Sequence, residues 1–382
     1  MTTRSKRKTI IFILIPVLIL IAIAAAFPFA SRALQKQEYL KDLQSLSFNK
    51  YLGEPVGYSS TRQFPHWEAY IFEAPEFQCV TGGPYVILAH RGEEADKTVL
   101  WFDVGAECWP GHAQCGGRLE SNLAAEETLQ YLVDGVEMSS FGPTSADKLN
   151  PVAKWNYIYL PTCDASSHFG DAAADFDEDG TADHWFNGLR QTSAAVNIAR
   201  ELFPDSRKIL VAGSSNGGYA TFGAAPITRL AFSDASLYVL NDSGPGIFSP
   251  DRPDVYPVIQ KAWNLAPMFP ADCEKCTQQL AYLADWMLAR DANLKIGLFT
   301  SYKDAIVSEV FGMEPEENRR LMLEVTGEIH ERHPQSYKRF LIKGDSHTIV
   351  DYYQKVDGVR LWDWIAQLVN DDPAWSEHLE EE

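Results

Sequence analysis

The chain has 382 residues, of which 46% are hydrophobic and 12% aromatic, so it can bury a large core. Its formal net charge is −19. Residues 1–30 hold four cations and no acid, so the rest of the chain has a net charge of −23. A charge of this sign repels polyanions, so we expect no nucleic-acid partner. No internal repeat or low-complexity tract is present, which excludes solenoid and disordered proteins.

The N-terminus predicts a segment that meets the membrane. Arg4, Lys6, Arg7 and Lys8 precede an uncharged run over residues 9–30, which is long enough to span a bilayer as a helix. The basic flank predicts that the N-terminus stays in the cytoplasm and that the rest is exported. Because residues 24–26 offer a small-residue cleavage site, residues 1–30 are either a signal anchor, which we favour, or a cleaved signal peptide.

The remaining chain divides into a stalk, one large domain and a tail. Residues 31–50 are polar with scattered apolar side chains and predict a juxtamembrane stalk or short helix. Residues 51–370 form the predicted catalytic domain, and residues 371–382 an acidic, frayed tail. The protein is therefore expected to be membrane-anchored with its domain outside the cytoplasm, or secreted if the leader is cleaved.

Short apolar runs alternate with helical patterns along the large domain. This alternation predicts a doubly wound α/β fold, because strands covered on both faces by helices read as continuous apolar runs. The predicted strands are Tyr85–Ala89, Thr98–Phe102, Trp155–Leu160, Lys208–Ala212, Leu237–Leu240, Lys295–Thr300 and Phe340–Ile342. The predicted helices are Leu119–Val133, Gln191–Leu202, Gly217–Ala225, Cys276–Ala289, Glu316–His333 and Leu361–Val369.

Six cysteines lie in the part that is expected to be exported. An even number of cysteines in an oxidising compartment predicts disulfides. A zinc site is not indicated, because the sequence has no paired Cys-x-x-Cys motifs and no histidine cluster near the cysteines. A redox role for the Cys273-x-x-Cys276 pair is the alternative to a small structural loop there. The cysteines are Cys79, Cys108, Cys115, Cys163, Cys273 and Cys276.

An acidic segment has the beginning of a calcium-binding loop. Asp175, Asp177, Asp179 and Asp183 occupy positions 1, 3, 5 and 9, with a glycine at position 6. Position 12, normally a glutamate that binds through both oxygens, is Phe186. A structural Ca²⁺ is therefore possible here, and the alternative is a solvated acidic loop; catalysis itself is expected to need no cofactor.

The strongest motif is Gly213-Ser214-Ser215-Asn216-Gly217, which follows an apolar strand and precedes a helical pattern. Strand, sharp turn with a serine, and helix are the order of a nucleophile elbow. The glycines permit the tight turn, and the helix N-terminus favours negative charge beside Ser215. We therefore predict Ser215 as a nucleophile rather than part of an ordinary turn.

A serine nucleophile needs a base and an acid that orients the base. His347 is the best-placed base because it lies in the loop after a late predicted strand, whereas His330, His333 and His378 lie in charged segments and are expected on the surface. For the acid, Asp304 and Asp242 each follow a strand, and Asp345 is too close to His347.

The oxyanion of acyl transfer needs backbone N–H donors. One is expected from Asn216, directly after the nucleophile. The others are expected from Gly105 and Ala106, in the loop after the predicted strand Thr98–Phe102.

These motifs together resemble the pectin acetylesterase/Notum family of serine carboxylesterases. The matching segments, in the family's order over about residues 79–350, are Cys79–Tyr85, Phe102–Cys108, Tyr159–Asp164, Gly213–Gly218, Asn241–Gly244, Tyr302–Asp304 and Ser346–His347. The resemblance implies an α/β-hydrolase fold and favours Asp304 over Asp242 as the acid. It also implies the disulfides Cys108–Cys115 and Cys79–Cys163, which leaves Cys273 with Cys276.

The chain departs from the family in its oxyanion loop. Val104 replaces a glycine, and the family's bulky aromatic near Ala106 and Glu107 is missing, so the shape of the acyl pocket does not carry over. The expected function is removal of an acyl group, most simply acetyl, from an oxygen ester of a small molecule, a polysaccharide or an acylated protein. The alternatives are a fatty-acyl deacylase or peptidase on the same fold, and a non-catalytic cell-surface binding protein.

Overall fold

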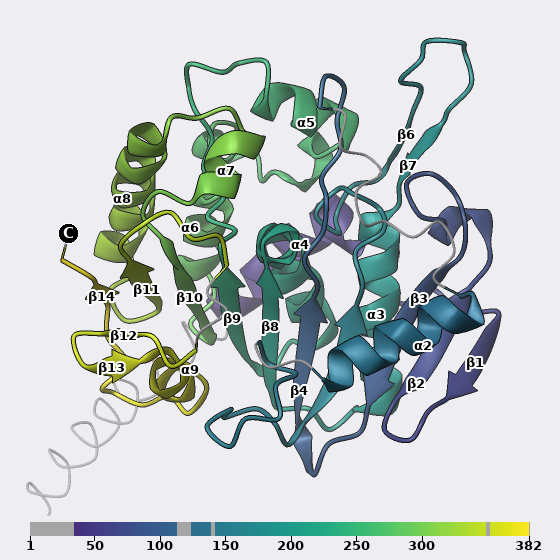
Figure 1. Cartoon of the computed structure of the whole chain (residues 1–382), viewed down its shortest axis with the longest axis horizontal. Helices are drawn as coiled ribbons and strands as arrows, with labels where there is room; N and C mark the ends of the chain where they lie inside the picture. The colour runs from purple at the N-terminus through teal and green to yellow at the C-terminus, as the bar shows by residue number, and fades with distance from the viewer. Residues whose placement is uncertain (1–33, 113–123, 139–141, 349–351, 382) are drawn as a thin grey trace, which may run out of the picture.

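The computed structural model describes residues 34–112, 124–138, 142–348 and 352–381. A ten-stranded sheet runs through this part of the chain in the order β1-β2-β3-β5-β4-β8-β9-β10-β11-β14 (Figure 1). Its strands are β1 Ser60–Gln63, β2 Glu68–Phe72, β3 Tyr85–His90, β4 Glu94–Phe102, β5 Trp155–Leu160, β8 Lys208–Ser214, β9 Ser236–Asp242, β10 Leu294–Ser301, β11 Tyr337–Ile342 and β14 His378–Leu379.

The sheet is parallel from β5 through β14 and antiparallel at its other edge. The pairs from β5–β4 to β11–β14 are all parallel, whereas β1–β2, β2–β3 and β3–β5 are antiparallel. Every predicted strand lies in this sheet, and the prediction of a mostly parallel α/β fold is confirmed. Because the central strands are covered on both faces, β5 and residues 209–214 of β8 are fully buried.

Helices cover both faces of the sheet (Figure 1). Helices α3, α4, α6 and α8 pack on one face, whereas α9 contacts β9 and β10 from the other, which α2 also covers. The helices are α2 Glu126–Glu137, α3 Gly188–Leu202, α4 Asn216–Ala231, α5 Tyr256–Ala262, α6 Tyr282–Leu288, α7 Ala305–Val310, α8 Pro315–Arg332 and α9 Leu361–Val369. Short 3₁₀ turns lie at Ser47–Asn49, Pro75–Phe77, Ala266–Met268 and Glu274–Thr277.

Some predicted helices differ from the structure. The segment Cys276–Ala289 is not one helix, because the 3₁₀ turn Glu274–Thr277 and α6 are separate elements. The first part of the predicted helix Leu119–Val133 lies outside the described residues, and α2 starts at Glu126.

Both ends of the described chain pack on the domain: residues 34–45 form a short helix, one of the two forms expected there, whereas the tail is not frayed as expected. A helix over residues 34–45 buries Tyr39 and Leu43, and the ring of Tyr39 packs against Trp286 at a centroid distance of 5.6 Å. At the other end, β14 extends the parallel sheet beside β11 and makes His378 a buried residue. Long-range contacts, which local composition does not reveal, hold both segments: side-chain packing holds the helix, and strand pairing holds β14.

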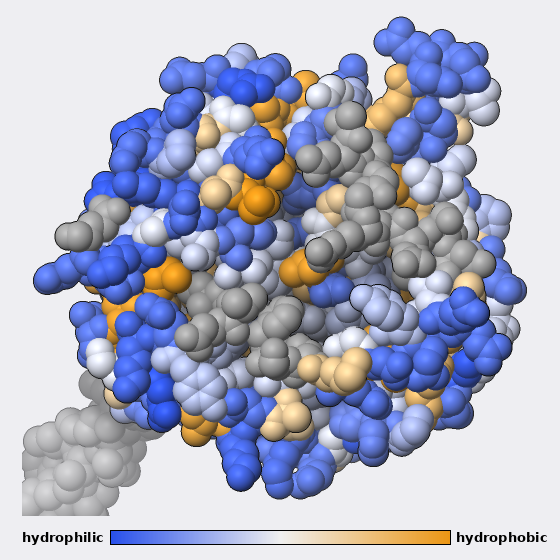
Figure 2. Space-filling view, viewed as in Figure 1, coloured by the Kyte–Doolittle hydropathy of each residue, from blue (hydrophilic) through white to orange (hydrophobic). Residues whose placement is uncertain are grey.

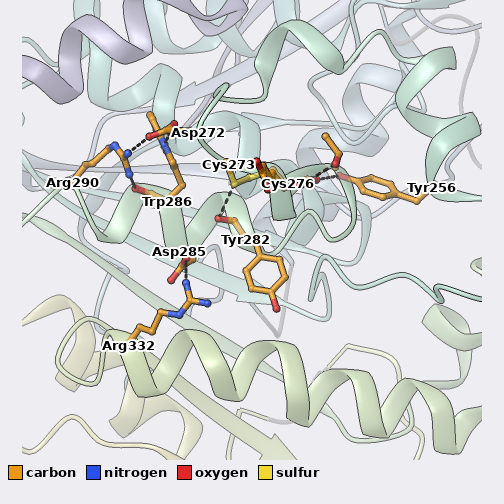
Figure 3. Close-up of a disulfide and its surroundings, with 11 residues drawn as sticks. Tyr256, Asp272, Cys273, Cys276, Tyr282, Asp285, Trp286, Arg290 and Arg332 are labelled. Carbon is orange, nitrogen blue, oxygen red and sulfur yellow. Dashed lines mark hydrogen bonds and ion pairs between the residues drawn. A yellow bond between two sulfur atoms is a disulfide. The ribbon is translucent and has the colours of Figure 1, made fainter.

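Two disulfides lie within the described residues, Cys79–Cys163 and Cys273–Cys276. Figure 3 shows the second, where the hydroxyl of Tyr256 donates to the carbonyl of Cys276 at 3.0 Å. Cys108 is also disulfide-bonded, but Cys115, its expected partner, lies outside the described residues.

The predicted membrane segment at residues 9–30 likewise lies outside the described residues. Among the residues that are described, no helix combines the length and the apolar character needed to cross a bilayer.

The acidic segment forms the tip of a hairpin. Strands β6 Ala172–Ala174 and β7 His184–Phe186 pair antiparallel and project beyond the rest of the domain (Figure 1). The tip is hydrophilic, as the blue surface at the upper right of Figure 2 shows. A second small hairpin joins β12 Lys355–Val356 to β13 Val359–Arg360, just before α9.

Candidate active site

The turn between β8 and α4 carries Ser215 in a strained conformation. Ser215 has φ 57° and ψ −117°, and its N–H donates to the carbonyl of Asp242 at 2.8 Å. Gly217 must be a glycine, because a Cβ there would lie 2.0 Å from the carbonyl oxygen of Phe102. This close contact of the helix start with β4 places Ser215 at the carboxyl ends of the strands, where α/β folds build their sites.

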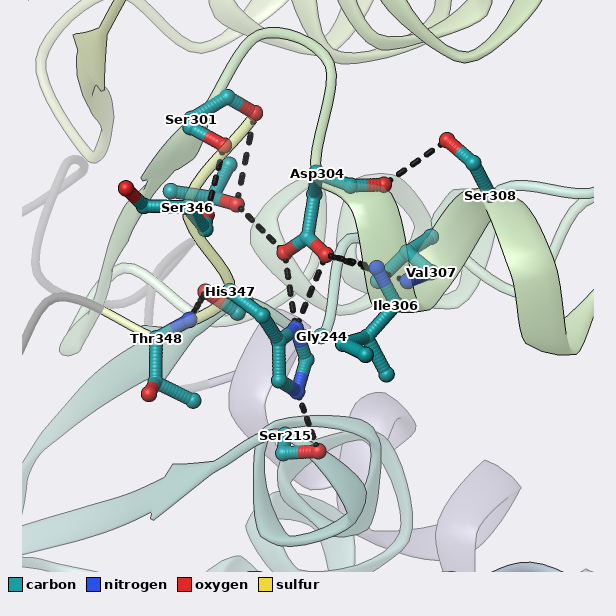
Figure 4. A network of polar contacts seen from close by, with 12 residues as sticks. Ser215, Gly244, Ser301, Asp304, Ile306, Val307, Ser308, Ser346, His347 and Thr348 are labelled. Atoms are coloured by element: carbon teal, nitrogen blue, oxygen red, sulfur yellow. Dashed lines mark hydrogen bonds and ion pairs between the residues drawn. The ribbon is translucent and has the colours of Figure 1, made fainter. Parts of the chain in front are cut away.

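Ser215, His347 and Asp304 form a continuous chain of polar contacts (Figure 4). Nε2 of His347 lies 2.7 Å from Oγ of Ser215, and Nδ1 lies 2.9 Å from each carboxylate oxygen of Asp304. The Asp304 side chain is fully buried, whereas that of His347 is 18% exposed. A buried carboxylate on Nδ1 leaves Nε2 free to accept the serine proton, which is the arrangement of a serine hydrolase.

Asp304 is held by the helix that follows it. Its Oδ1 accepts the backbone N–H groups of Ile306 and Val307, which makes Asp304 the N-cap of α7. The cap fixes the side-chain rotamer that the contact with His347 requires.

The loop of His347 is braced on both sides. The hydroxyl of Ser301 donates to the carbonyl of Ser346 at 2.6 Å, and the N–H of Thr348 donates to Oγ of Ser243 at 3.0 Å (Figure 4). Ser243, with φ 57°, is a further left-handed residue at the end of a central strand. These serines are site residues that the sequence did not single out, because only the packed sheet ends bring them to the histidine.

The alternative acid and the other histidines take different places. Asp242 accepts a hydrogen bond from Ser214 at 2.5 Å and one from Ser243 at 3.0 Å, within the elbow. His330 and His333 are half-buried on α8 or at its end, and His333 pairs with Asp285. His378 is 8% exposed, so the expectation of a surface position for it is wrong.

The expected oxyanion residues lie around the same cavity as Ser215. Within the described residues, the backbone N–H groups of Gly105, Ala106 and Asn216 donate to no other protein group. Gly105 must be small, since a Cβ there would lie 2.4 Å from the side chain of Thr162. Unpaired donors at a helix start and in a facing loop suit a developing negative charge.

This cavity has a volume of about 110 Å³. One wall is apolar and comes mainly from α7, while the oxyanion loop and the elbow form the other. Its lining residues are Gly105, Ala106, Glu107, His112, Ser215, Asn216, Tyr219, Ile306, Val307, Val310, Phe311 and His347.

Glu107 is a buried acid in this lining to which the sequence assigned no role. Burial raises the pKa of the Glu107 carboxyl to about 7, although hydrogen bonds from Ser167 and Asn216 oppose the shift. Burial likewise raises the pKa of the nearby Asp164 carboxyl to about 6. The position of Glu107, directly after Gly105 and Ala106, was the feature of the sequence that could have identified it as a site residue.

Among the described residues, three carboxylates at the hairpin tip lie close enough together to hold a metal. Ligand oxygens of Asp175, Asp177 and Asp179 lie within 4.8 Å of one another. Asp183 instead accepts the N–H of Phe176 at 3.0 Å and contacts Nδ1 of His184 at 2.7 Å. The first three aspartates therefore converge as expected and the fourth does not, so the Ca²⁺ site stays a prediction.

A family model matches the part of the chain that holds the nucleophile elbow. The family model described as Pectinacetylesterase matches residues 69–256, a range that contains the elbow and the oxyanion loop but neither Asp304 nor His347. No curated protein matches the chain by sequence.

Among solved structures, the chain is similar to the Wnt deacylase Notum from Drosophila. The TM-score is 0.55 at 14% sequence identity, and the alignment covers 83% of this chain and 97% of that one. At this identity the likeness establishes the fold. Residues 69–256 of this chain match the pectinacetylesterase family, and the chain is a carboxylic ester hydrolase.

Proposed function

We propose that this protein is a serine esterase that removes a short acyl group from an oxygen ester. The observation that carries the proposal is the contact chain from Ser215 through His347 to the buried Asp304. The unpaired N–H groups around the adjoining cavity support the same chemistry.

In this mechanism Ser215 Oγ attacks the ester carbonyl while Nε2 of His347 accepts its proton. Asp304 holds the imidazole through Nδ1 and stabilises the imidazolium that forms. The oxyanion is held by the N–H groups of Gly105, Ala106 and Asn216, and the leaving alcohol takes the proton from His347. A water molecule, activated by the same histidine, then hydrolyses the acyl-serine.

The size of the cavity supports a short acyl group such as acetyl. About 110 Å³ is small beside the roughly 300–1,000 Å³ of pockets that take drug-sized ligands. Ile306, Val310 and Phe311 give an apolar wall for a methyl or short alkyl chain. The family supports an acetylated polysaccharide as the natural substrate, whereas the Notum likeness leaves an acylated protein as the alternative.

We also propose that the domain works outside the cytoplasm. The basic flank and the apolar run over residues 9–30 support export, and so do the disulfides of the domain.

The test of the proposed function is hydrolysis of 4-nitrophenyl esters graded from acetyl to palmitoyl, with 4-nitroacetanilide as the amide. We expect the highest kcat/KM for the acetyl or propionyl ester and no measurable amide hydrolysis. A preference for chains of twelve carbons or more would contradict the short-acyl proposal. Turnover of no ester would favour a non-catalytic binding protein, and turnover of the amide would favour a peptidase.

A further inference from the structure

Glu107 connects the two segments that form the oxyanion site. It directly follows Ala106 in the loop after β4, and its Oε1 accepts the side-chain amide of Asn216 at 3.3 Å and the hydroxyl of Ser167 at 2.7 Å. Its side chain is buried, with 8% of the residue exposed, and it lines the cavity beside Ser215.

The amide of Asn216 is fixed by several such contacts. Its Nδ2 also lies 3.5 Å from the carbonyl of Ala106, and its Oδ1 accepts from the hydroxyl of Thr162 at 3.4 Å. These contacts tie the start of α4 to the oxyanion loop. The N–H donors for the oxyanion come from both the loop and the start of α4. The distance between these donors therefore depends on the contacts of the Asn216 amide.

The charged and titratable groups that face Glu107 come from several elements. His347 favours its ionised form, whereas the buried Asp164 opposes it. The buried hydroxyl of Tyr219 on α4 has its pKa raised by burial and by the Glu107 charge. His112 lines the same cavity, and burial lowers the pKa of its imidazole. Burial is the largest of these effects, so the carboxyl loses its charge more readily than a surface glutamate does.

We propose that Glu107 is a positioning residue that holds Asn216 in place, and that full turnover requires its uncharged form. The inference rests on the proposed function. An ionised Glu107 places a negative charge next to both segments that donate to the oxyanion. It follows Ala106 directly in the loop, and it is hydrogen-bonded to Asn216 at the start of α4. A like charge there opposes the oxyanion, whereas the neutral carboxyl keeps the same contacts without that cost.

The proposal predicts a pH profile that falls on its alkaline side. Activity falls as the Glu107 carboxyl loses its proton, because its charge then opposes the oxyanion. The pKa of about 7 that burial gives the Glu107 carboxyl sets the falling limb near neutral pH.

The experiment measures kcat/KM for 4-nitrophenyl acetate from pH 5 to pH 10, with spontaneous hydrolysis subtracted. We expect the wild type to lose at least about tenfold between pH 7 and pH 9, and Glu107→Gln, which keeps an acceptor oxygen, to lack this fall. Ser167→Ala removes a donor that favours the ionised form, so it should move the fall to higher pH. Glu331→Gln, at an exposed site on α8, is the matched control and should keep the wild-type profile.

A fall of the same size in Glu107→Gln, or a wild type with no fall above neutral pH, would overturn the proposal. If Glu107→Gln does not fold, the proposal is tested by Ser167→Ala. An alkaline fall in activity at the same pH as in the wild type would then overturn the proposal. Labelling by an organophosphonate ester separates this failure from failure of the proposed function. If Ser215 is labelled but the variants show the same alkaline fall in kcat/KM as the wild type, only the role of Glu107 is refuted. If Ser215 is not labelled, the proposed esterase function is refuted.

Discussion

Asp304 holds His347 and caps α7 with the same carboxylate. Its oxygens lie 2.9 Å from Nδ1 of His347 while Oδ1 also accepts two backbone N–H groups of the helix. The acid is therefore rigid because local backbone fixes it, and the histidine takes its orientation from the acid. Substitutions of Asp304 should separate these two tasks.

Asp304→Asn should lose activity and keep the fold. Asparagine is an equally good N-cap, but it cannot stabilise the imidazolium, so we expect kcat to fall on the order of 10⁴-fold with little change in stability. Asp304→Ala should lose comparable activity and an additional roughly 1 kcal/mol of unfolding free energy, because the cap is lost as well. Steady-state kinetics and urea unfolding of both variants measure the two effects.

Asp242→Asn is the comparison for this pair. Asp242 contacts Ser214 and Ser243 rather than His347, so its substitution should cost much less turnover. A folded Asp242→Asn that is far less active than Asp304→Asn would show that the acid has been misassigned.

The local parts of the site could be predicted from the sequence, and the long-range parts could not. The strand, turn and glycines around Ser215 are contiguous, and chain order with the family resemblance selected Asp304 and His347. The braces from Ser243 and Ser301, and the contact of Glu107 with Asn216, join segments that meet only when the sheet forms.

The same reason explains what was missed in the fold. Strand β1 is exposed along its whole length, so it carries no apolar signal. Strand β14 lies in an acidic tail, where composition predicts fraying, yet it pairs with β11. The helix over residues 34–45 is polar in composition, but it buries Tyr39 and Leu43 against the domain.

Stability should fall as the pH rises from about 4.5 to about 7. The pKa of the Glu107 carboxyl is raised by burial from 4.5 to about 7, so the folded state binds a proton that the unfolded state has released. The stability that this proton provides is complete below about pH 4.5 and is lost as the pH rises to 7, with a loss of roughly 3 kcal/mol. Asp164, with its pKa raised by burial to about 6, acts in the same direction.

Urea unfolding of the wild type and Glu107→Gln at pH 5 and pH 8 measures this linkage. The variant should gain stability relative to the wild type at pH 8 and gain much less at pH 5. An equal difference at the two pH values would mean that Glu107 does not change its protonation on unfolding.

The two described disulfides should differ in their contribution to stability. Cys79–Cys163 closes a loop with a sequence separation of 84, whereas Cys273–Cys276 spans 3. Chain entropy predicts losses of roughly 4–5 kcal/mol for the first and about 2 kcal/mol for the second. Thermal melts of the double alanine variants test this order, and a larger loss for Cys273→Ala/Cys276→Ala would contradict it.

Calcium should raise the melting temperature if the hairpin tip binds it. Asp175, Asp177 and Asp179 converge, and a cation that neutralises them stabilises the folded loop by mass action. Because Phe186 stands where a calcium loop has its glutamate, binding should be weak, with a Kd of roughly 10⁻⁴–10⁻³ M. Thermal melts in millimolar Ca²⁺ and in EGTA, repeated on Asp177→Ala/Asp179→Ala, measure the shift. If the wild-type melting temperature is the same in both, the hairpin tip is an acidic turn that does not bind calcium.

The central claim is that Ser215 is a nucleophile activated by His347. The most direct measurement is labelling of the intact protein with an organophosphonate ester, followed by mass mapping of the modified peptide. We expect one adduct on Ser215, none on Ser215→Ala, and labelling of His347→Ala slower by several orders of magnitude, because the serine then lacks its base. An unlabelled Ser215 in folded protein, or equal labelling rates with and without His347, would contradict the account.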